Sequence, residues 1–160
     1  MIDLNAAGAG LGGYQMLAAQ LEALLSGERD FIANAAQFSA FLYNQVDDLN
    51  WAGFYLNRDG ELVLGPFQGQ VACVRIAFGR GVCGAAAATR QTQRVEDVHA
   101  FPGHIACDSA SNSELVIPLV KAGRLIGVLD LDSPKLARFS VDDQAGLEHL
   151  AAIFLQATDC

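Results

Sequence analysis

Two short turns between extended segments constrain the fold of this chain more than any other feature. The first turn, Asn57-Arg-Asp-Gly60, separates the alternating segments Trp51–Leu56 and Glu61–Pro66. Its Asp-Gly pair accommodates the positive φ angles that a tight β-hairpin requires. A second turn, Lys121-Ala-Gly123, lies nearer the end of the chain. Hairpins join antiparallel strands, so an antiparallel sheet is predicted.

Helical periodicity flanks these hairpins. From Gly13 to Leu25 apolar residues recur at intervals of three and four, which predicts an amphipathic helix. Asp30 is a good N-cap for a second helix, and Ser140-Val-Asp-Asp143 resembles a capping box before a closing helix. A short helix is predicted at Gly81–Thr89. Further strands are predicted at Val71–Phe78, Gln93–Val98, Ser113–Val120 and Arg124–Leu131. These elements indicate an α+β fold, an antiparallel sheet with N-terminal helices and a C-terminal helix packed on it.

Length and composition fit one domain. The chain has 160 residues, 52% of them apolar and 18% charged, which is enough to bury one continuous core. We expect residues 1–12 to form a flexible N-terminus and residues 13–158 a single domain. No basic stretch precedes a long apolar run, so neither a signal peptide nor a membrane span is expected. A cytoplasmic location follows, in which a disulfide is more often catalytic than structural. The net charge of -8 argues against nucleic-acid binding, because phosphate contacts need clustered Lys and Arg.

Three cysteines lie in the stretch from Val71 to Glu114. Cys83 follows Cys73 by ten residues, and Cys107 follows after twenty-four more. This spacing excludes the Cys-x-x-Cys pairs of zinc ribbons and thioredoxin-like motifs. Structural burial, disulfide pairing and thiol chemistry are left open.

The predicted surroundings of the cysteines differ. Cys83 lies at the start of a helix, where unpaired N–H groups and the helix dipole favour a thiolate. Cys107 lies in the long aperiodic segment His99–Asn112, and such segments are usually functional. Cys73 alternates within an apolar strand, which favours a small buried hydrophobic residue. A zinc site that adds His99 and His104 to the cysteines is an alternative, but no paired spacing supports it. We therefore expect no metal and no other cofactor.

Three glycines fit a nucleotide-binding pattern. Gly79, Gly81 and Gly84 match Gly-x-Gly-x-x-Gly and lie between a predicted strand and a predicted helix. The acid expected about twenty residues further on is missing at a strand end, and a hairpin follows where a crossover would be needed. We therefore interpret the glycines as a tight turn that lets the backbone approach a small ligand.

Acidic and aromatic residues suggest a binding site. Glu114, Asp130 and Asp132 flank the last predicted hairpin, and the two aspartates share a face because side chains alternate along a strand. Trp51 and Tyr55 lie on one face of the first strand. Together these residues would form a box for an ammonium group with an aromatic wall. The alternative is a solvated strand end and two core aromatics.

Taken as a set, these residues resemble the free methionine-(R)-sulfoxide reductases, a family built on the GAF domain. The resemblance extends from about Tyr14 to Phe154, and the spacing of the three cysteines is its specific part. The matching segments are Trp51-Ala-Gly-Phe-Tyr55, Gly65-Pro-Phe-Gln-Gly-Gln70, Gly79-Arg-Gly-Val-Cys83-Gly, Cys107-Asp-Ser-Ala-Ser-Asn-Ser-Glu114-Leu-Val-Ile-Pro and Ile126-Gly-Val-Leu-Asp130-Leu-Asp132-Ser.

The resemblance implies a role for each matching thiol and aromatic residue. Cys107 matches the reactive cysteine, Cys73 its disulfide partner, and Cys83 a third thiol. Trp51 and Tyr55 match the aromatic wall around the methyl sulfoxide end of the substrate.

The resemblance also implies the chemistry. Glu114, Asp130 and Asp132 match acids that hold the substrate amino group and act on the sulfoxide oxygen, with Glu114 or Asp132 as the proton donor. Free L-methionine-(R)-sulfoxide would be reduced to methionine through a thiol, sulfenic acid and disulfide cycle. An external dithiol, usually thioredoxin in this family, would then reduce the enzyme. A homodimer is left open.

Two alternative functions involve no turnover. One is a GAF-type sensor that holds a small ligand. The other is a redox sensor in which Cys73 and Cys107 form a disulfide without turning over a substrate.

Overall fold

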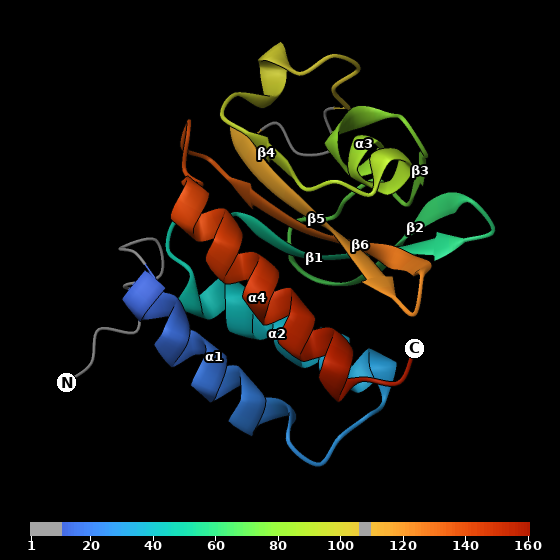
Figure 1. Cartoon of the computed structure of the whole chain (residues 1–160). Helices are drawn as coiled ribbons and strands as arrows, with labels where there is room; N and C mark the ends of the chain where they lie inside the picture. Colours follow the sequence, from blue (N-terminus) through green and yellow to red (C-terminus); the bar gives the residue numbers. More distant parts are fainter. Residues whose placement is uncertain (1–10, 106–109) are drawn as a thin grey trace.

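A six-stranded sheet forms the centre of the molecule, with helices on both of its faces (Figure 1). The computed structural model describes residues 11–105 and 110–160. The strands are β1 (Trp51–Arg58), β2 (Glu61–Gly69), β3 (Arg75–Ala77), β4 (Gln93–Val95), β5 (Ser113–Lys121) and β6 (Arg124–Ser133). The helices are α1 (Leu11–Leu25), α2 (Phe31–Gln45), α3 (Gly81–Thr89) and α4 (Val141–Ala157), and Val98–Ala100 forms a 3-10 turn. The strand order is β3-β2-β1-β6-β5-β4 with every neighbouring pair antiparallel, so the predicted α+β fold is confirmed.

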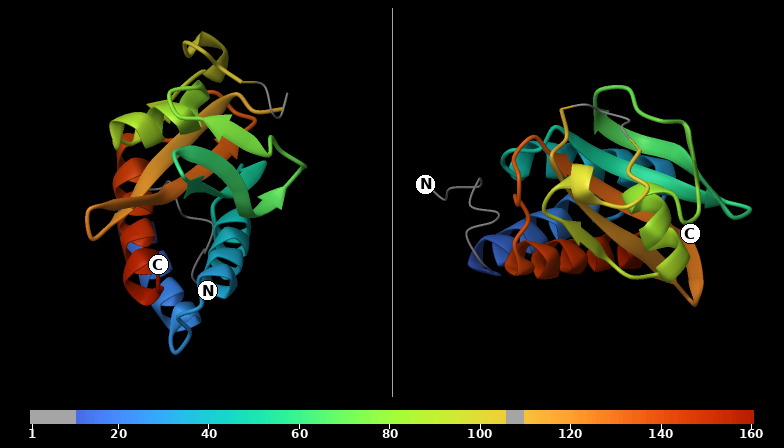
Figure 2. Two further views of the ribbon diagram at one scale, coloured as in Figure 1. Left: turned by 90° about the vertical axis from the view of Figure 1, so that its right-hand side faces the viewer. Right: turned by 90° about the horizontal axis from the view of Figure 1, so that it is seen from above.

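The two faces of the sheet are covered by different helices. Figure 2 shows α2 and α4 along one face, with α1 packed on them, and α3 on the opposite face. Side-chain alternation accounts for this arrangement. Phe54 and Leu129, which are paired across β1 and β6, belong to the core under α2 and α4. The next pair, Tyr55 and Val128, belongs to the second core beneath α3.

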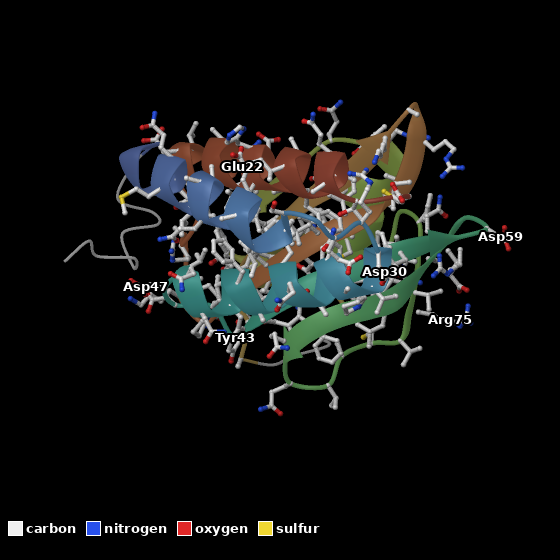
Figure 3. The ribbon with its side chains drawn as sticks, turned by 90° about the horizontal axis from the view of Figure 1, so that it is seen from below. Glu22, Asp30, Tyr43, Asp47, Asp59 and Arg75 are labelled. Atoms are coloured by element: carbon white, nitrogen blue, oxygen red, sulfur yellow. The ribbon has the colours of Figure 1, made fainter. Side chains whose placement is uncertain are left out.

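Both predicted hairpin turns are present. In the first, Asp59 and Gly60 have φ angles of 54° and 87°, and Gly60 N donates a hydrogen bond of 2.9 Å to Asn57 Oδ1. Asp59 lies at the outer tip of this hairpin, away from the helices (Figure 3). In the second turn, Ala122 and Gly123 have φ angles of 52° and 76°.

Side chains cap the helices that cover the sheet. Asp30, at the start of α2 in Figure 3, accepts a hydrogen bond of 2.9 Å from Ala33 N, as predicted. Ser140 and Asp143 form the predicted capping box of α4. Asp143 also accepts a hydrogen bond of 2.6 Å from the Tyr14 hydroxyl. One carboxylate therefore both caps α4 and anchors α1.

Two predicted strands are shorter in the structure. Only residues 75–77 of the predicted strand Val71–Phe78 form β3. β4 ends at Val95 instead of Val98, because Asp97 caps the 3-10 turn by accepting a hydrogen bond of 3.0 Å from His99 N. A capped 3-10 turn therefore replaces the end of the predicted strand Gln93–Val98.

The ends of the described segments bear on two predictions. α1 begins at Leu11, slightly before its predicted start at Gly13. Residues 1–10 and 106–109 lie outside the described residues, so the flexible N-terminus and the position of Cys107 stay predictions. Within residues 11–105 and 110–160, none of the helices is both long and apolar enough to span a bilayer.

Candidate functional site

Strand register gathers three acidic side chains on the α3 face of the sheet. Glu114 of β5 lies opposite Asp132 of β6, and Asp132 lies opposite Trp51 of β1. Asp130 precedes Asp132 by two residues on β6, so it points to the same face, and it lies opposite Gly53 of β1. Residues directly opposite each other on paired antiparallel strands point to the same side. The prediction that Asp130 and Asp132 share a face is therefore confirmed, and Glu114 and Trp51 share it with them.

A cavity lies between this wall and α3. It has a volume of about 50 Å³. The lining residues are Trp51, Tyr55, Ala72, Ile76, Arg80, Gly81, Val82, Cys83, His104, Ile105, Ser111, Glu114, Asp130 and Asp132. Among the described residues, every catalytic or substrate-binding residue predicted from the sequence lines the cavity except Cys73. Its neighbour Ala72 does line the cavity.

The three carboxyl groups are buried, with exposed fractions of 9% for Glu114, 4% for Asp130 and 9% for Asp132. Burial, and then the charge of Asp130, raise the pKa of Glu114 well above its usual value. Burial and the charge of Asp132 raise the pKa of Asp130 in the same way. Asp130 Oδ1 accepts no hydrogen bond within the part of the chain that the structure describes. The cluster therefore retains protons at pH values where isolated carboxyl groups are ionised.

Cys83 is buried beside the same acids. Its thiol lies 3.8 Å from Glu114 Oε2 and is oriented to donate to it. Burial, followed by the charges of Asp130 and Glu114, raises the pKa of the Cys83 thiol. The expectation that the helix start favours a thiolate at Cys83 is therefore wrong. α3 does begin at Gly81, but lost solvation and nearby acids outweigh the helix dipole.

Cys73 lies between β2 and β3, half-buried and disulfide-bonded. Two aromatic side chains hold this segment. The Tyr55 hydroxyl donates a hydrogen bond of 2.8 Å to the Cys73 carbonyl, and Trp51 Nε1 donates one of 3.1 Å to the Gln70 carbonyl. These carbonyls bind aromatic side chains instead of a neighbouring strand, so the prediction of Cys73 as a strand residue is wrong. Its expected partner Cys107 lies outside the described residues, and that pairing stays a prediction.

The aromatic wall is larger than the sequence predicted. The Trp51 ring stacks on Tyr55, with centroids 5.8 Å apart, and on Phe67, with centroids 5.1 Å apart. Phe67 faces Gly53 across β1 and β2, and a Cβ atom at Gly53 would lie 2.3 Å from Phe67 Cβ. Gly53 thus leaves the space that Phe67 occupies. No local pattern in the sequence assigns Phe67 a role, because only the register of β1 and β2 places it beside Trp51.

The glycine motif forms the tight turn that the sequence predicted. Gly79 and Gly81 have φ angles of 83° and 60°, and Gly79 N donates a hydrogen bond of 2.8 Å to the Gly84 carbonyl. A Cβ atom at Gly84 would lie 2.6 Å from the Ala77 carbonyl oxygen. The turn brings Gly81 to the cavity, in agreement with a backbone that approaches a small ligand.

Within residues 11–105 and 110–160, the histidines join no metal-binding cluster with a thiol. His99 Nδ1 lies 3.0 Å from Asp97 Oδ1, and the His99 and His104 rings are 5.6 Å apart. His104 lines the cavity. Among the described residues, the thiol and carboxylate ligand atoms that converge belong to Cys83, Glu114 and Asp130, all within 4.8 Å of one another.

Comparison with known proteins gives the family. The GAF domain family profile matches residues 21–159. The chain is 58% identical over 139 residues to the free methionine-R-sulfoxide reductase of Escherichia coli K12, covering 87% of this chain and 84% of that protein.

The chain belongs to the GAF-domain family of free methionine-R-sulfoxide reductases. A reductase of the same name from Saccharomyces cerevisiae is 42% identical over 147 residues, which cover 87% of this chain and 82% of the yeast protein. A crystal structure of the Neisseria meningitidis free methionine-R-sulfoxide reductase in complex with its substrate is also similar. It superposes with a TM-score of 0.87 at 47% identity, over 91% of this chain and 88% of that one. The family resemblance drawn from the sequence motifs is confirmed.

The motifs of this reductase family surround the cavity. The segments that contain Trp51, Cys83, Glu114 and Asp130 contribute lining residues. Gly65–Gln70 contacts Trp51 through the Phe67 ring and the Gln70 carbonyl. The five motif segments are thus distant in sequence but adjacent in space.

Proposed function

We propose that this protein reduces free L-methionine-(R)-sulfoxide to methionine and water at the expense of a dithiol. The observation that carries the proposal is the wall on which Glu114, Asp130 and Asp132 are buried together beside Trp51. Burial of three acids is costly unless a ligand or protons balance their charge. An amino acid that carries an ammonium group and a sulfoxide offers both a cation and a proton acceptor.

The acid cluster would supply the proton that the reaction needs. Attack of a thiolate on the sulfoxide sulfur proceeds only if the sulfoxide oxygen is protonated as its bond to sulfur breaks. Glu114 and Asp130 have raised pKa values, because burial and neighbouring charge disfavour their ionised forms. A carboxyl group that stays protonated near neutral pH is a suitable acid. Glu114, one of the two acids expected from the sequence, would be such a donor.

The same cluster would select the free amino acid. A methionine sulfoxide residue inside a protein has no α-ammonium group, so buried carboxylates would lose their cationic partner on binding it. The resulting unpaired buried charge would cost about 3–5 kcal/mol. Preference for the R epimer is taken from the named relatives.

The thiol cycle requires two cysteines. The Cys107 thiolate would attack the sulfoxide sulfur as the oxygen takes up a proton. The resulting hydroxyl would pass to the Cys107 sulfur as the bond between the two sulfurs breaks, which releases methionine and leaves a Cys107 sulfenic acid. The Cys73 thiol would then attack the Cys107 sulfur, expel water and close a disulfide. The disulfide bond at Cys73 and its hydrogen-bonded position on Tyr55 support this role.

An external dithiol of the thioredoxin type would complete the cycle by reducing the Cys73 disulfide. Val71 and Val74, on either side of Cys73, are 85% and 61% exposed. An exposed apolar segment next to a disulfide suits contact with a protein reductant. A cytoplasmic location would supply such dithiols.

Turnover of single epimers tests the proposal. The protein is incubated with free methionine-R-sulfoxide or methionine-S-sulfoxide and dithiothreitol, and methionine is quantified. We expect methionine from the R epimer and little from the S epimer or from N-acetylmethionine sulfoxide. The Asp132→Asn variant should show a markedly raised KM or lowered kcat. Methionine sulfoxide that binds without turnover would instead support a GAF-type sensor, and a reversible disulfide with neither binding nor turnover would support a redox sensor.

A further inference from the structure

We propose that Cys83, Glu114 and Asp130 form a binding site for a zinc-type divalent cation, and that the cation competes with the sulfoxide substrate. The competition depends on the proposed function, because both ligands would use the same carboxylates. The metal site itself depends only on the geometry of the cluster.

The ligand atoms of this cluster lie near enough to one another to close on one tetrahedral ion. Zinc binds thiolate sulfur at about 2.3 Å and carboxylate oxygen at about 2.0–2.2 Å, so two such ligands lie about 3.5 Å apart in a tetrahedron. Cys83 Sγ and Glu114 Oε2 are 3.8 Å apart. A ligand atom of Asp130 lies within 4.8 Å of both. To reach a separation of about 3.5 Å, the Cys83 and Glu114 atoms need to approach by a few tenths of an ångström and the Asp130 atom by at most about 1.3 Å.

An unsatisfied oxygen at the same place independently indicates a missing partner. Asp130 is 4% exposed, and its Oδ1 accepts no hydrogen bond from the described residues. A buried carboxylate oxygen without a donor is costly. A cation on the cavity side of Asp130 would remove this cost, as would the ammonium group of an amino acid.

The ligand types favour zinc over the abundant hard cations. Magnesium and calcium are held by oxygen ligands, whereas a thiolate selects softer metals. On binding, the Cys83 thiol would release its proton to solvent and give its sulfur to the metal. The other charged or titratable groups that line the cavity are Asp132, a further acid, the phenol of Tyr55, His104 and Arg80. The Arg80 guanidinium opposes the binding of a cation, and the three clustered acids favour it.

The metal site would leave one coordination position open to the cavity. Three protein ligands are the number found where zinc keeps a water or substrate in the fourth position. The bound cation would occupy the space beside the carboxylates that the proposed function gives to the substrate. Zinc would therefore inhibit the reductase by exclusion of methionine sulfoxide.

Cobalt(II) is the probe, because a thiolate bound to Co²⁺ gives a charge-transfer absorption band. The protein is titrated in its disulfide form, in which Cys83 and Cys160 are free. We expect a band that saturates at about one Co²⁺ per chain and that Zn²⁺ removes. The Cys83→Ser variant should lose the band, and the Asp130→Asn variant should bind Co²⁺ at least about tenfold more weakly. The matched control Cys160→Ser should keep the band.

Thermal unfolding without metal verifies that each variant is folded. Absence of the band in the unaltered chain, or its persistence in folded Cys83→Ser, would overturn the metal site. Methionine sulfoxide should displace Co²⁺, whereas alanine, which controls for simple chelation, should not. A band that methionine sulfoxide leaves unchanged would overturn the competition. The turnover assay reports separately on the proposed function, so the two proposals fail independently.

Discussion

Glu114 and Asp132 face each other directly across β5 and β6, and both side chains are buried. Like charges in directly opposite positions of a sheet are destabilising, and burial adds a desolvation cost. Such a pair is expected where a binding or catalytic requirement opposes stability.

Replacing Glu114 by Gln is expected to stabilise the fold at pH 7 by several tenths to about 1 kcal/mol. The pKa of Glu114 is raised in the folded state, so the folded protein binds more protons there than the unfolded chain. Stability therefore falls as the pH rises from the unfolded pKa through the folded one. The substitution removes this loss of stability, and its stabilising effect should be larger at pH 7 than at pH 4.

Urea unfolding of both proteins at both pH values measures this effect. Glu22→Gln, on the outer surface of α1 (Figure 3), is the control. An equal gain at both pH values would contradict the prediction.

Substitutions of the two cysteines of the proposed cycle should impair turnover in different ways. Cys107→Ser should abolish turnover, because the attacking sulfur is gone. Cys73→Ser should still release about one methionine per chain in a single turnover and then stop, because no thiol closes the disulfide. Rapid mixing and quantification of methionine separate the two results. Cys160→Ser, an exposed free cysteine, should leave activity unchanged. Sustained turnover by Cys107→Ser would identify another nucleophile.

Tyr55→Phe tests whether the phenol positions Cys73. The substitution keeps the aromatic ring beside Trp51 and removes the hydrogen bond to the Cys73 carbonyl. One hydrogen bond corresponds to about 0.5–1.5 kcal/mol, so disulfide formation after the first turnover should slow by about 2–10-fold. The KM for the sulfoxide should change little. Thiol trapping at timed intervals measures the rate, with Tyr43→Phe, on the outer surface of α2 (Figure 3), as control. An unchanged rate of disulfide formation would show that Tyr55 lines the cavity but does not position Cys73.

A charge beside Cys73 should weaken the contact with a protein reductant. Val74→Asp places a carboxylate on the exposed apolar segment next to the disulfide. The KM for thioredoxin should rise by about fivefold to tenfold, which corresponds to about 1 kcal/mol or slightly more. Turnover driven by dithiothreitol should be unaffected, because a small dithiol needs no docking surface. Val141→Asp, an exposed valine at the start of α4, is the matched control. An equal loss of turnover with thioredoxin and with dithiothreitol would show that the segment affects the reaction itself and not the contact with the protein reductant.

Tyr14→Phe is expected to destabilise the fold by about 1–3 kcal/mol, because the buried Asp143 carboxylate loses a donor. Asp143 keeps its partners Arg138 and Ser140, so the protein should still fold. Chemical denaturation measures the loss, and kcat should be unchanged because this pair lies in the helical layer. A stability equal to that of the unaltered chain would show that the hydrogen bond makes no net contribution.

Local sequence patterns predicted the elements of this fold because the causes are local. The Asp59-Gly60 turn, the Asp30 cap and the capping box of α4 each depend on a few consecutive residues. The same reasoning failed at Val71–Phe78. There the Gln70 and Cys73 carbonyls bind Trp51 and Tyr55, residues about twenty positions earlier that no local pattern connects to this segment.

The sequence by itself determined the family, the antiparallel sheet and the residues that carry the proposed chemistry, since motif spacing and turn residues can be read along the chain. Tertiary structure alone decided how those residues act on one another. The register of β5 on β6 places Glu114 against Asp132, and that of β1 on β2 places Phe67 against Trp51. The packing of α3 on this wall buries Cys83 among the acids and raises its pKa, where the sequence had predicted a thiolate. Burial and distance set these effects, and both are properties of the folded chain.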